Sequence, residues 1–470
     1  MLSITLGKLK LLESGSLTAE ENAARLLEKI LREDMSLGAF IETFGSDALE
    51  EARAVDAARR NGAVGRMAGL GVSIKNSVAV AGRRLTCGSR MLEDYRAPFE
   101  ATAVSRLRAA GGVLLGSTNI DEFCSGSDCS RSAICKTVNP VDHSRVPGGS
   151  SGGAAAATAA GLCDVALAED TGGSIRCPAS FCGVAGFKPT YGAVSRYGVV
   201  DMAMSFDQLG PIAPDVFGCA LMLSAIAGED AKDVTTAGAP AVDFTRGLDS
   251  LPKGIRVALP KQFFVGCDAG VEKLVRKAVA KLEAHGAVVE EVDFPIVSYA
   301  LPIYYLLVFS EFASAMQKFD GLKYGFKANV DSNDLIDAVS EARRQAFGTE
   351  AKRRILLGTF ITTKEHREAW YSKTLKARSL LKAEFARLFK EFDVVAGPTM
   401  PMVAWQCGEK SQDPLQMYLA DVLTVPANCA GLPAGSVPCG SVGGLPVGVQ
   451  LMAAWGSDAL ALKAMAAVES

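Results

Sequence analysis

Three stretches of this sequence place a helical pattern of apolar residues directly before a short apolar run of strand length. The pairs are 102–112 with 113–119, 271–286 with 287–295, and 377–392 with 393–401. Units in which helices and strands alternate build a largely parallel or mixed sheet that is covered by helices. The sequence therefore predicts an α/β fold.

The two ends of the sequence carry further elements. Residues 16–61 have a helical pattern, with Thr18 and Glu21 spaced as a capping box and a stop at Asn61–Gly62. Near the other end, a strand over 445–453 precedes a helix over 457–469 that Ser457 is expected to cap.

No change of composition marks a linker, and no repeat recurs at a fixed period. We predict a single domain over residues 1–470. It would have an N-terminal helical segment at 1–61, a core at 68–230 and a helical insertion at about 300–370.

Composition excludes several classes of protein. Lys plus Arg is 49 and Asp plus Glu is 52, so the chain has no basic excess for binding nucleic acid. The run of small and apolar residues at 152–163 is too short to span a membrane. The 12 cysteines form no CxxC pair and there are 3 histidines, so we expect no bound metal. Scattered cysteines in a large chain indicate reduced thiols and a cytoplasmic protein.

Two clusters of glycine and serine could carry chemistry. VPGGSSGG at 146–153 could cradle a phosphate, but no lysine follows it as a phosphate loop requires. In the second cluster, DTGGS at 170–174, a strand pattern ends in a tight turn that would present Ser174 as a nucleophile. The alternative for this cluster is a packing turn.

A serine nucleophile needs a base. Three histidines in the whole chain make a Ser-His-Asp arrangement a poor candidate. Lys75 lies in the apolar stretch VSIKNSVAV, where burial would lower its pKa enough for it to act as a base. The alternative is a strand-end lysine that reaches to water.

Together, Lys75, GGSSGG at 148–153 and DTGGSIRCPASFCG at 170–183 resemble the amidase signature family. The resemblance implies a large mixed β-sheet between layers of helices. It also implies amide hydrolysis by a Ser-cis-Ser-Lys triad, with Ser174 as nucleophile, Ser150 as bridging serine after a cis bond from Gly149, and Lys75 as base. The oxyanion hole would be formed by the backbone N–H groups of Thr171, Gly172, Gly173 and Ser174.

Longer stretches, among them GFKPTYGAVSRYG and SFDQLGPIAPDV, resemble the glutaminase subunits of aspartyl/glutamyl-tRNA(Asn/Gln) amidotransferases, a group within that family. Such subunits hydrolyse glutamine and pass ammonia to a B subunit, which uses ATP and Mg²⁺ to amidate mischarged tRNA, while a small C subunit wraps the pair. The resemblance therefore implies B and C partners, no cofactor on this chain, and Glu-tRNA(Gln) or Asp-tRNA(Asn) as the acceptor.

By the same resemblance, Tyr305, Arg354 and Asp421 would line the glutamine pocket. An arginine can clamp the α-carboxylate and an aspartate can accept from the α-ammonium. The alternatives are a surface arginine in a basic run and a carboxylate on a helix surface.

The sequence departs from the usual motifs at Asn76, where aspartate is common, at Ser125, where methionine is usual, and at Cys177, where glutamine is common. Two other functions stay open at this point. A stand-alone amidase would share the triad without needing Arg354 and Asp421, and a catalytically silent scaffold would not need the intact triad.

Overall fold

The structure is a computed structural model that describes residues 3–329, 334–410 and 413–470. In these residues, eleven strands form one sheet in the order β1-β3-β2-β4-β6-β5-β10-β11-β9-β7-β8. The strands are β1 (Phe40–Thr43), β2 (Gly71–Lys75), β3 (Val113–Thr118), β4 (Val165–Asp170), β5 (Ala185–Lys188), β6 (Gln208–Ala213), β7 (Arg256–Pro260), β8 (Val288–Val292), β9 (Val394–Pro398), β10 (Ala434–Val442) and β11 (Leu445–Ala453).

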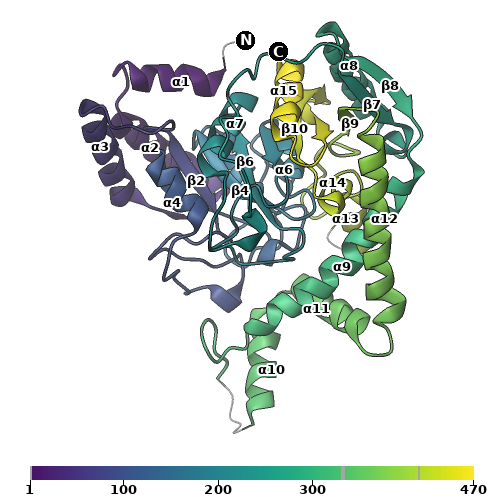
Figure 1. The fold of residues 1–470 in the computed structure, drawn as a ribbon. Helices are drawn as coiled ribbons and strands as arrows, with labels where there is room; N and C mark the ends of the chain where they lie inside the picture. Colours follow the sequence, from purple (N-terminus) through teal and green to yellow (C-terminus); the bar gives the residue numbers. More distant parts are fainter. Residues whose placement is uncertain (1–2, 330–333, 411–412) are drawn as a thin grey trace.

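The same residues form fifteen α-helices (Figure 1). They are α1 (Ile4–Glu13), α2 (Ala19–Leu37), α3 (Gly45–Arg60), α4 (Thr102–Ala109), α5 (Gly152–Ala159), α6 (Arg176–Cys182), α7 (Val216–Ile226), α8 (Ala269–Ala284), α9 (Ala300–Ala315), α10 (Leu335–Ala346), α11 (Thr349–Thr362), α12 (Lys373–Leu388), α13 (Pro414–Leu419), α14 (Val425–Ala430) and α15 (Asp458–Glu469).

The sheet is mixed, as predicted. β2 runs parallel to β3 and β4, and β7 runs parallel to β8 and β9. The centre, from β4 through β6, β5 and β10 to β11, is antiparallel. The three predicted helix–strand pairs are present as α4 with β3, α8 with β8, and α12 with β9.

Helices cover both faces of the sheet. Alternate residues of β4 enter two separate cores, with Val165 and Leu167 in one and Ala166 and Ala168 in the other. α7, α8 and α15 contribute to the first core, whereas the alanines of α5 and part of α6 pack into the second. This layered arrangement confirms the predicted fold class.

The N-terminal prediction is confirmed in part. The capping box of α2 forms, because Thr18 Oγ1 accepts from the Glu21 N–H while the Glu21 carboxylate accepts from the Thr18 N–H. α3 ends at Arg60, just before Asn61–Gly62. Both helices lie within the predicted helical segment, but Gly38 ends α2 with φ 66° and β1 then adds an antiparallel edge strand to β3, which was not predicted.

β11 and α15 confirm the predicted C-terminal elements. Ser457 is the N-cap residue of α15, as predicted, but its side chain makes no capping hydrogen bond. That part of the prediction is wrong.

The predicted insertion at about 300–370 contains α9, α10 and α11, and α12, the helix of the third helix–strand pair, follows it (Figure 1). α10 and α11 project from the body of the protein, and α9 packs against α11, α12 and α14. The helical stretch Pro295–Lys318 is long and apolar enough to cross a membrane, but 61% of its most apolar window is buried. Because three helices pack against it, we interpret α9 as the core helix of this insertion.

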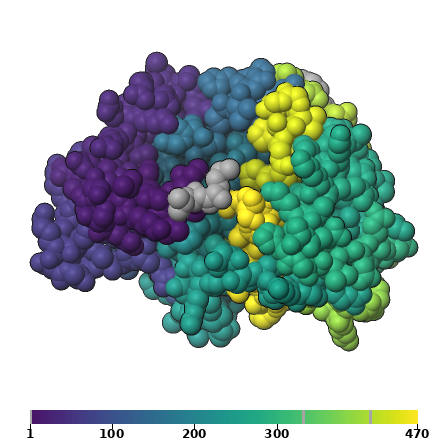
Figure 2. All heavy atoms as spheres, turned by 90° about the horizontal axis from the view of Figure 1, so that it is seen from above, coloured from purple at the N-terminus to yellow at the C-terminus, as the bar shows by residue number. Residues whose placement is uncertain are grey.

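Viewed from above, the purple N-terminal residues occupy one side of the molecule and teal-green residues occupy the other (Figure 2). The yellow C-terminal residues lie between them. This position agrees with the packing of α15 on β10, α7 and α8.

Candidate active site

The predicted base, Lys75, is the last residue of β2 and is fully buried. Its Nζ donates to Ser150 Oγ at 2.8 Å and to the main-chain oxygen of Glu169 at 3.1 Å. β2 pairs with β4 in parallel, so both strands end at the same edge of the sheet. The alternative of a lysine that reaches to water is excluded by this burial.

The predicted bridging serine, Ser150, lies in the glycine-rich loop before α5, and its peptide bond from Gly149 is cis, as the resemblance implied. A Cβ on Gly149 would lie 2.3 Å from Asp121 Oδ2, so the loop packs too closely for any side chain there. Because Ser150 Oγ accepts from Lys75, the contact favours a catalytic loop over a phosphate-binding loop.

The predicted nucleophile, Ser174, lies in the turn after β4 and is 8% exposed. Its main-chain oxygen accepts from the Ser151 N–H at 3.2 Å, which ties the loop of Ser150 to this turn. Gly173 has φ +132°, a backbone conformation that favours glycine. The fold thus brings both serines and Lys75 to one edge of the sheet. That the Ser174 hydroxyl donates to Ser150 stays a prediction.

A buried ion pair supports the turn. Arg176 and Asp170 are both fully buried, and two guanidinium nitrogens of Arg176 donate to the carboxylate at 2.9 and 3.0 Å. Arg176 also donates to Gln450 and Asn428. Burial opposes ionisation of Asp170, but the charge of Arg176 outweighs it and holds the pKa of Asp170 below its usual range. These contacts fix the backbone that carries Ser174.

The predicted oxyanion hole needs one correction. The Gly173 N–H donates to Asp170 Oδ1 at 2.8 Å, so this group is directed at the carboxylate and away from a substrate. The main-chain oxygen of Gly172 accepts from Thr424 Oγ1 at 2.6 Å, which fixes the preceding peptide. The N–H groups of Thr171, Gly172 and Ser174 remain predicted donors to an oxyanion.

The three predicted pocket residues converge from separate segments. Tyr305 on α9 donates through its hydroxyl to Asp421 Oδ2 at 2.6 Å. The Arg354 guanidinium on α11 lies 5.8 Å from the centre of the Tyr305 ring. All three side chains are buried, with Arg354 3% exposed and Asp421 7% exposed. A surface arginine and a surface carboxylate are therefore excluded.

A family model described as Amidase matches residues 21–462. The chain belongs to the amidase family. The A subunit of the glutamyl-tRNA(Gln) amidotransferase of Moorella thermoacetica is 48% identical over 461 residues, covering 98% of this chain and 94% of that relative.

Two solved structures resemble this amidase over nearly its whole length. The A subunit of the glutamyl-tRNA(Gln) amidotransferase from Thermotoga maritima has a TM-score of 0.80 and 38% identity, covering 96% of this chain and 91% of that one. A peptide amidase from Stenotrophomonas maltophilia has a TM-score of 0.81 and 30% identity, covering 98% of this chain and 95% of that one.

Sequence reasoning missed three residues around the pocket of this amidase. Ser127 Oγ lies 2.8 and 3.1 Å from the two carboxylate oxygens of Asp421. Glu350 accepts from Arg354 Nε at 2.9 Å and from the Tyr418 hydroxyl at 2.8 Å. The spacing of Glu350 four residues before Arg354 on a helix was a usable sequence signal. Ser127 and Tyr418 reach the pocket only because distant segments pack together, so no local sequence pattern marks them.

The prediction that the pKa of Lys75 is lowered is wrong. Burial lowers the pKa of Lys75, as expected, but the neighbouring Cys124 and Glu169 outweigh it, and the pKa is raised. The ammonium form is therefore favoured near neutral pH. Lys75 must lose a proton before it can act as a base.

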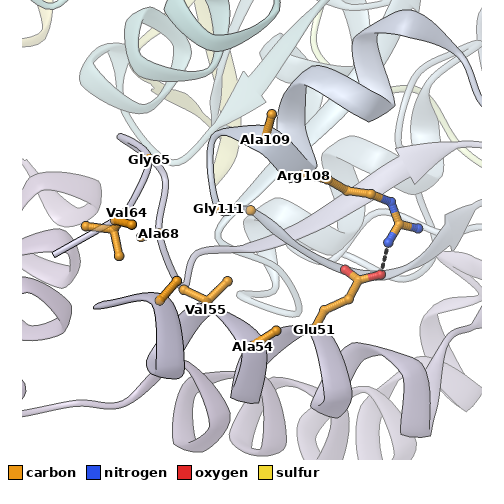
Figure 3. Close-up of a pocket in the computed structure, with 12 residues that line it drawn as sticks. Glu51, Ala54, Val55, Val64, Gly65, Ala68, Arg108, Ala109 and Gly111 are labelled. Atoms are coloured by element: carbon orange, nitrogen blue, oxygen red, sulfur yellow. Dashed lines mark hydrogen bonds and ion pairs between the residues drawn. The ribbon is translucent and has the colours of Figure 1, made fainter. Parts of the chain in front are cut away.

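No group of three or more His, Cys, Asp and Glu side chains is placed to hold a metal ion within the described residues. A cavity of about 270 Å³ opens between α3 and the end of α4 (Figure 3). It is lined largely by alanines and glycines, and an ion pair joins Arg108 to Glu51 beside it. None of the predicted site residues lines this cavity, so it carries no part of the active site.

Proposed function

We propose that this chain is the glutaminase subunit of a tRNA-dependent amidotransferase. The observation that carries the proposal is the convergence of Arg354 and Asp421 on Tyr305, in a chain that also joins Lys75 to Ser150. Hydrolysis of a simple amide needs only the contact between Lys75 and Ser150. Free glutamine also needs a cation for its α-carboxylate and an anion for its α-ammonium.

In the proposed reaction, Ser174 Oγ attacks the carboxamide carbon of glutamine. Its proton passes to Ser150 Oγ, and Ser150 passes its own proton to neutral Lys75. The N–H groups of Thr171, Gly172 and Ser174 bind the oxyanion. The C–N bond then breaks, and the proton on Lys75 returns through Ser150 to the departing nitrogen, which leaves as ammonia. Water hydrolyses the glutamyl ester on Ser174 by the same proton route and releases glutamate.

The proposed partners are a B subunit, which would hold ATP, Mg²⁺ and mischarged tRNA, and a small C subunit. A net charge of -3 supports a role in which tRNA binding is left to the partner. The acceptor would be Glu-tRNA(Gln), with Asp-tRNA(Asn) as the second candidate. A cytoplasmic location is supported by the twelve free cysteines.

Purification from the native cell, followed by a glutaminase assay with and without the partner chains, ATP and mischarged tRNA, tests this proposal. We expect two partner chains to co-purify and ammonia to reach the tRNA. A chain that purifies alone and hydrolyses small amides as fast as glutamine would instead favour the stand-alone amidase.

Replacing Arg354 with alanine should raise the KM for glutamine by about 10- to 150-fold, because charged hydrogen bonds contribute about 1.5–3 kcal/mol. The KM for a simple amide without an α-carboxylate should change little. Steady-state kinetics on both substrates make the comparison. Lys352→Ala is the matched control, since Lys352 Nζ donates to the main-chain oxygen of Arg344. Equal increases for the two substrates would remove Arg354 from carboxylate binding.

Glutamine affinity should fall as the pH drops through the titration of Asp421. Burial raises the pKa of Asp421 to about 6, against hydrogen bonds from Tyr305 and Ser127. Below that pH the carboxyl is neutral and no longer attracts the α-ammonium. Calorimetric titration of the inactive Ser174→Ala variant with glutamine should show this loss, and Asp421→Asn should bind weakly at every pH. An affinity that does not change from about pH 7 to about pH 5 would contradict the assignment.

A further inference from the structure

One buried acidic side chain belongs to the residue whose main-chain oxygen accepts from Lys75, and it has no part in the reaction above. Glu169 is the residue before the last of β4 and is fully buried. Its Oε2 accepts from Ser77 Oγ at 2.5 Å and from Cys124 Sγ at 3.3 Å. Its Oε1 is buried and has no hydrogen-bond partner in the described part of the chain. A buried carboxyl oxygen without a partner is costly, so this side chain needs an explanation.

The backbone of the same residue already holds the lysine. Lys75 Nζ donates to the main-chain oxygen of Glu169, and Ser151 Oγ donates to that oxygen as well, both at 3.1 Å. The main chain of Glu169 therefore connects β4, which leads to Ser174, with Lys75 and with the loop that carries Ser150 and Ser151. The neighbouring residue Asn76 is uncharged, so it gives the lysine no counter-ion.

Glu169 also accounts for the charge state of this site. Burial by itself would lower the pKa of Lys75, whereas Cys124 and Glu169 raise it. Burial raises the pKa of the Cys124 thiol far above neutral, so this group carries no charge under working conditions. The Cys124 thiol therefore supplies no charge to Lys75, which leaves Glu169 as the acidic group of this pair that can supply one.

A second carboxyl group lies close to Glu169. Asp207 accepts from Thr171 Oγ1 at 2.7 Å, and burial together with the charge of Glu169 raises the pKa of Asp207 well above its usual range. The titratable or charged groups that surround the lysine are Cys87, Cys124, Glu169, Asp170 with its partner Arg176, and Asp207.

We propose that Glu169 is a positioning residue of the amidase reaction, whose main-chain oxygen holds Lys75 at Ser150 and whose buried side chain, bonded to Ser77 and Cys124, controls how readily the lysine releases its proton. The inference rests on the proposed triad, because it acts through Lys75. Glu169 does not touch the substrate. It sets the pH at which the lysine becomes a base.

The test follows the pH dependence of Ser174 sulfonylation in the full-length protein, with its partners when they co-purify. The probe is a sulfonyl fluoride, which labels an activated serine without needing the glutamine pocket. In the wild-type protein, the labelling rate should rise with pH as Lys75 loses its proton. Glu169→Gln removes the charge, so the midpoint of this rise should move down by about one pH unit or more.

Three variants separate a positioning role from a structural one. Glu169→Asp, which retains the charge, should return the midpoint toward the wild-type value. Glu169→Met replaces the carboxyl group with an apolar side chain of similar length. It takes the place of Glu169→Gln in the pH measurement if that variant does not fold. Asp164→Asn is the matched control, because Asp164 is a buried carboxylate just before the other end of β4. It should lower the melting temperature and leave the midpoint unchanged.

The outcomes distinguish this inference from the proposed function. If wild-type Ser174 is not labelled, or labelling is independent of pH, the triad itself is wrong. If the wild-type rate rises with pH but the charge-removing variants keep the same midpoint, the triad stands and the role of Glu169 is overturned.

Discussion

Replacing Ser174 with alanine should abolish glutamine hydrolysis, with a fall in kcat/KM of about 10⁴-fold or more. No other described serine follows β4 in a glycine turn and is joined by its backbone to the loop that carries Ser150. Without the hydroxyl there is no acyl-enzyme, and only binding and the oxyanion donors remain. Ammonia release at saturating glutamine, measured on the complex with its partners, gives the size of the loss.

The control is Ser180→Ala. Ser180 is another buried serine, which lies on α6, and its Oγ accepts from the Gly448 N–H at 3.0 Å. This variant should lose some stability and keep its activity. If Ser174→Ala hydrolyses glutamine as fast as the wild-type protein, the nucleophile has been misassigned.

The sequence predicted the triad because its parts lie in short motifs. Lys75 ends an apolar strand and Ser174 follows a glycine turn, so local patterns marked these two residues as candidates, whereas the role of Ser150 came from the family resemblance. The structure adds the 2.8 Å contact between Lys75 and Ser150, which no spacing along the chain could give. Arg354 and Asp421 needed the family resemblance, because their local patterns alone favoured a surface position.

Other features depend on contacts between distant segments, and the sequence did not predict them. The net direction of the Lys75 pKa depends on Cys124 and Glu169, which lie in other segments of the chain. The N–H of Gly173 was assigned to the oxyanion, but Asp170 accepts from it once the turn folds back. The fold shows the same limit. Helix–strand units were predictable, whereas the short edge strand β1 is defined by its pairing with β3.

Lys75→Met should lower kcat/KM for glutamine by about 10²- to 10⁴-fold, the range usual for loss of a general base. The pH profile should change as well. Because the pKa of Lys75 is raised, the wild-type rate should increase with pH as the ammonium loses its proton. The methionine variant has no such group, so this increase should disappear. Steady-state rates of the two proteins across the alkaline range provide the comparison.

Lys188→Met separates loss of a base from loss of a buried lysine. Lys188 is 1% exposed, and its Nζ donates to the main-chain oxygens of Pro189 and Leu432 at 2.8 and 2.5 Å. Burial lowers the pKa of Lys188 to about 7, so it resembles a base more closely than Lys75 does, but no serine accepts from it among the described contacts. Its replacement should lower the melting temperature and leave the pH dependence of the folded protein intact. If Lys75→Met behaves in that same way, the lysine is structural and another group takes the proton from Ser150.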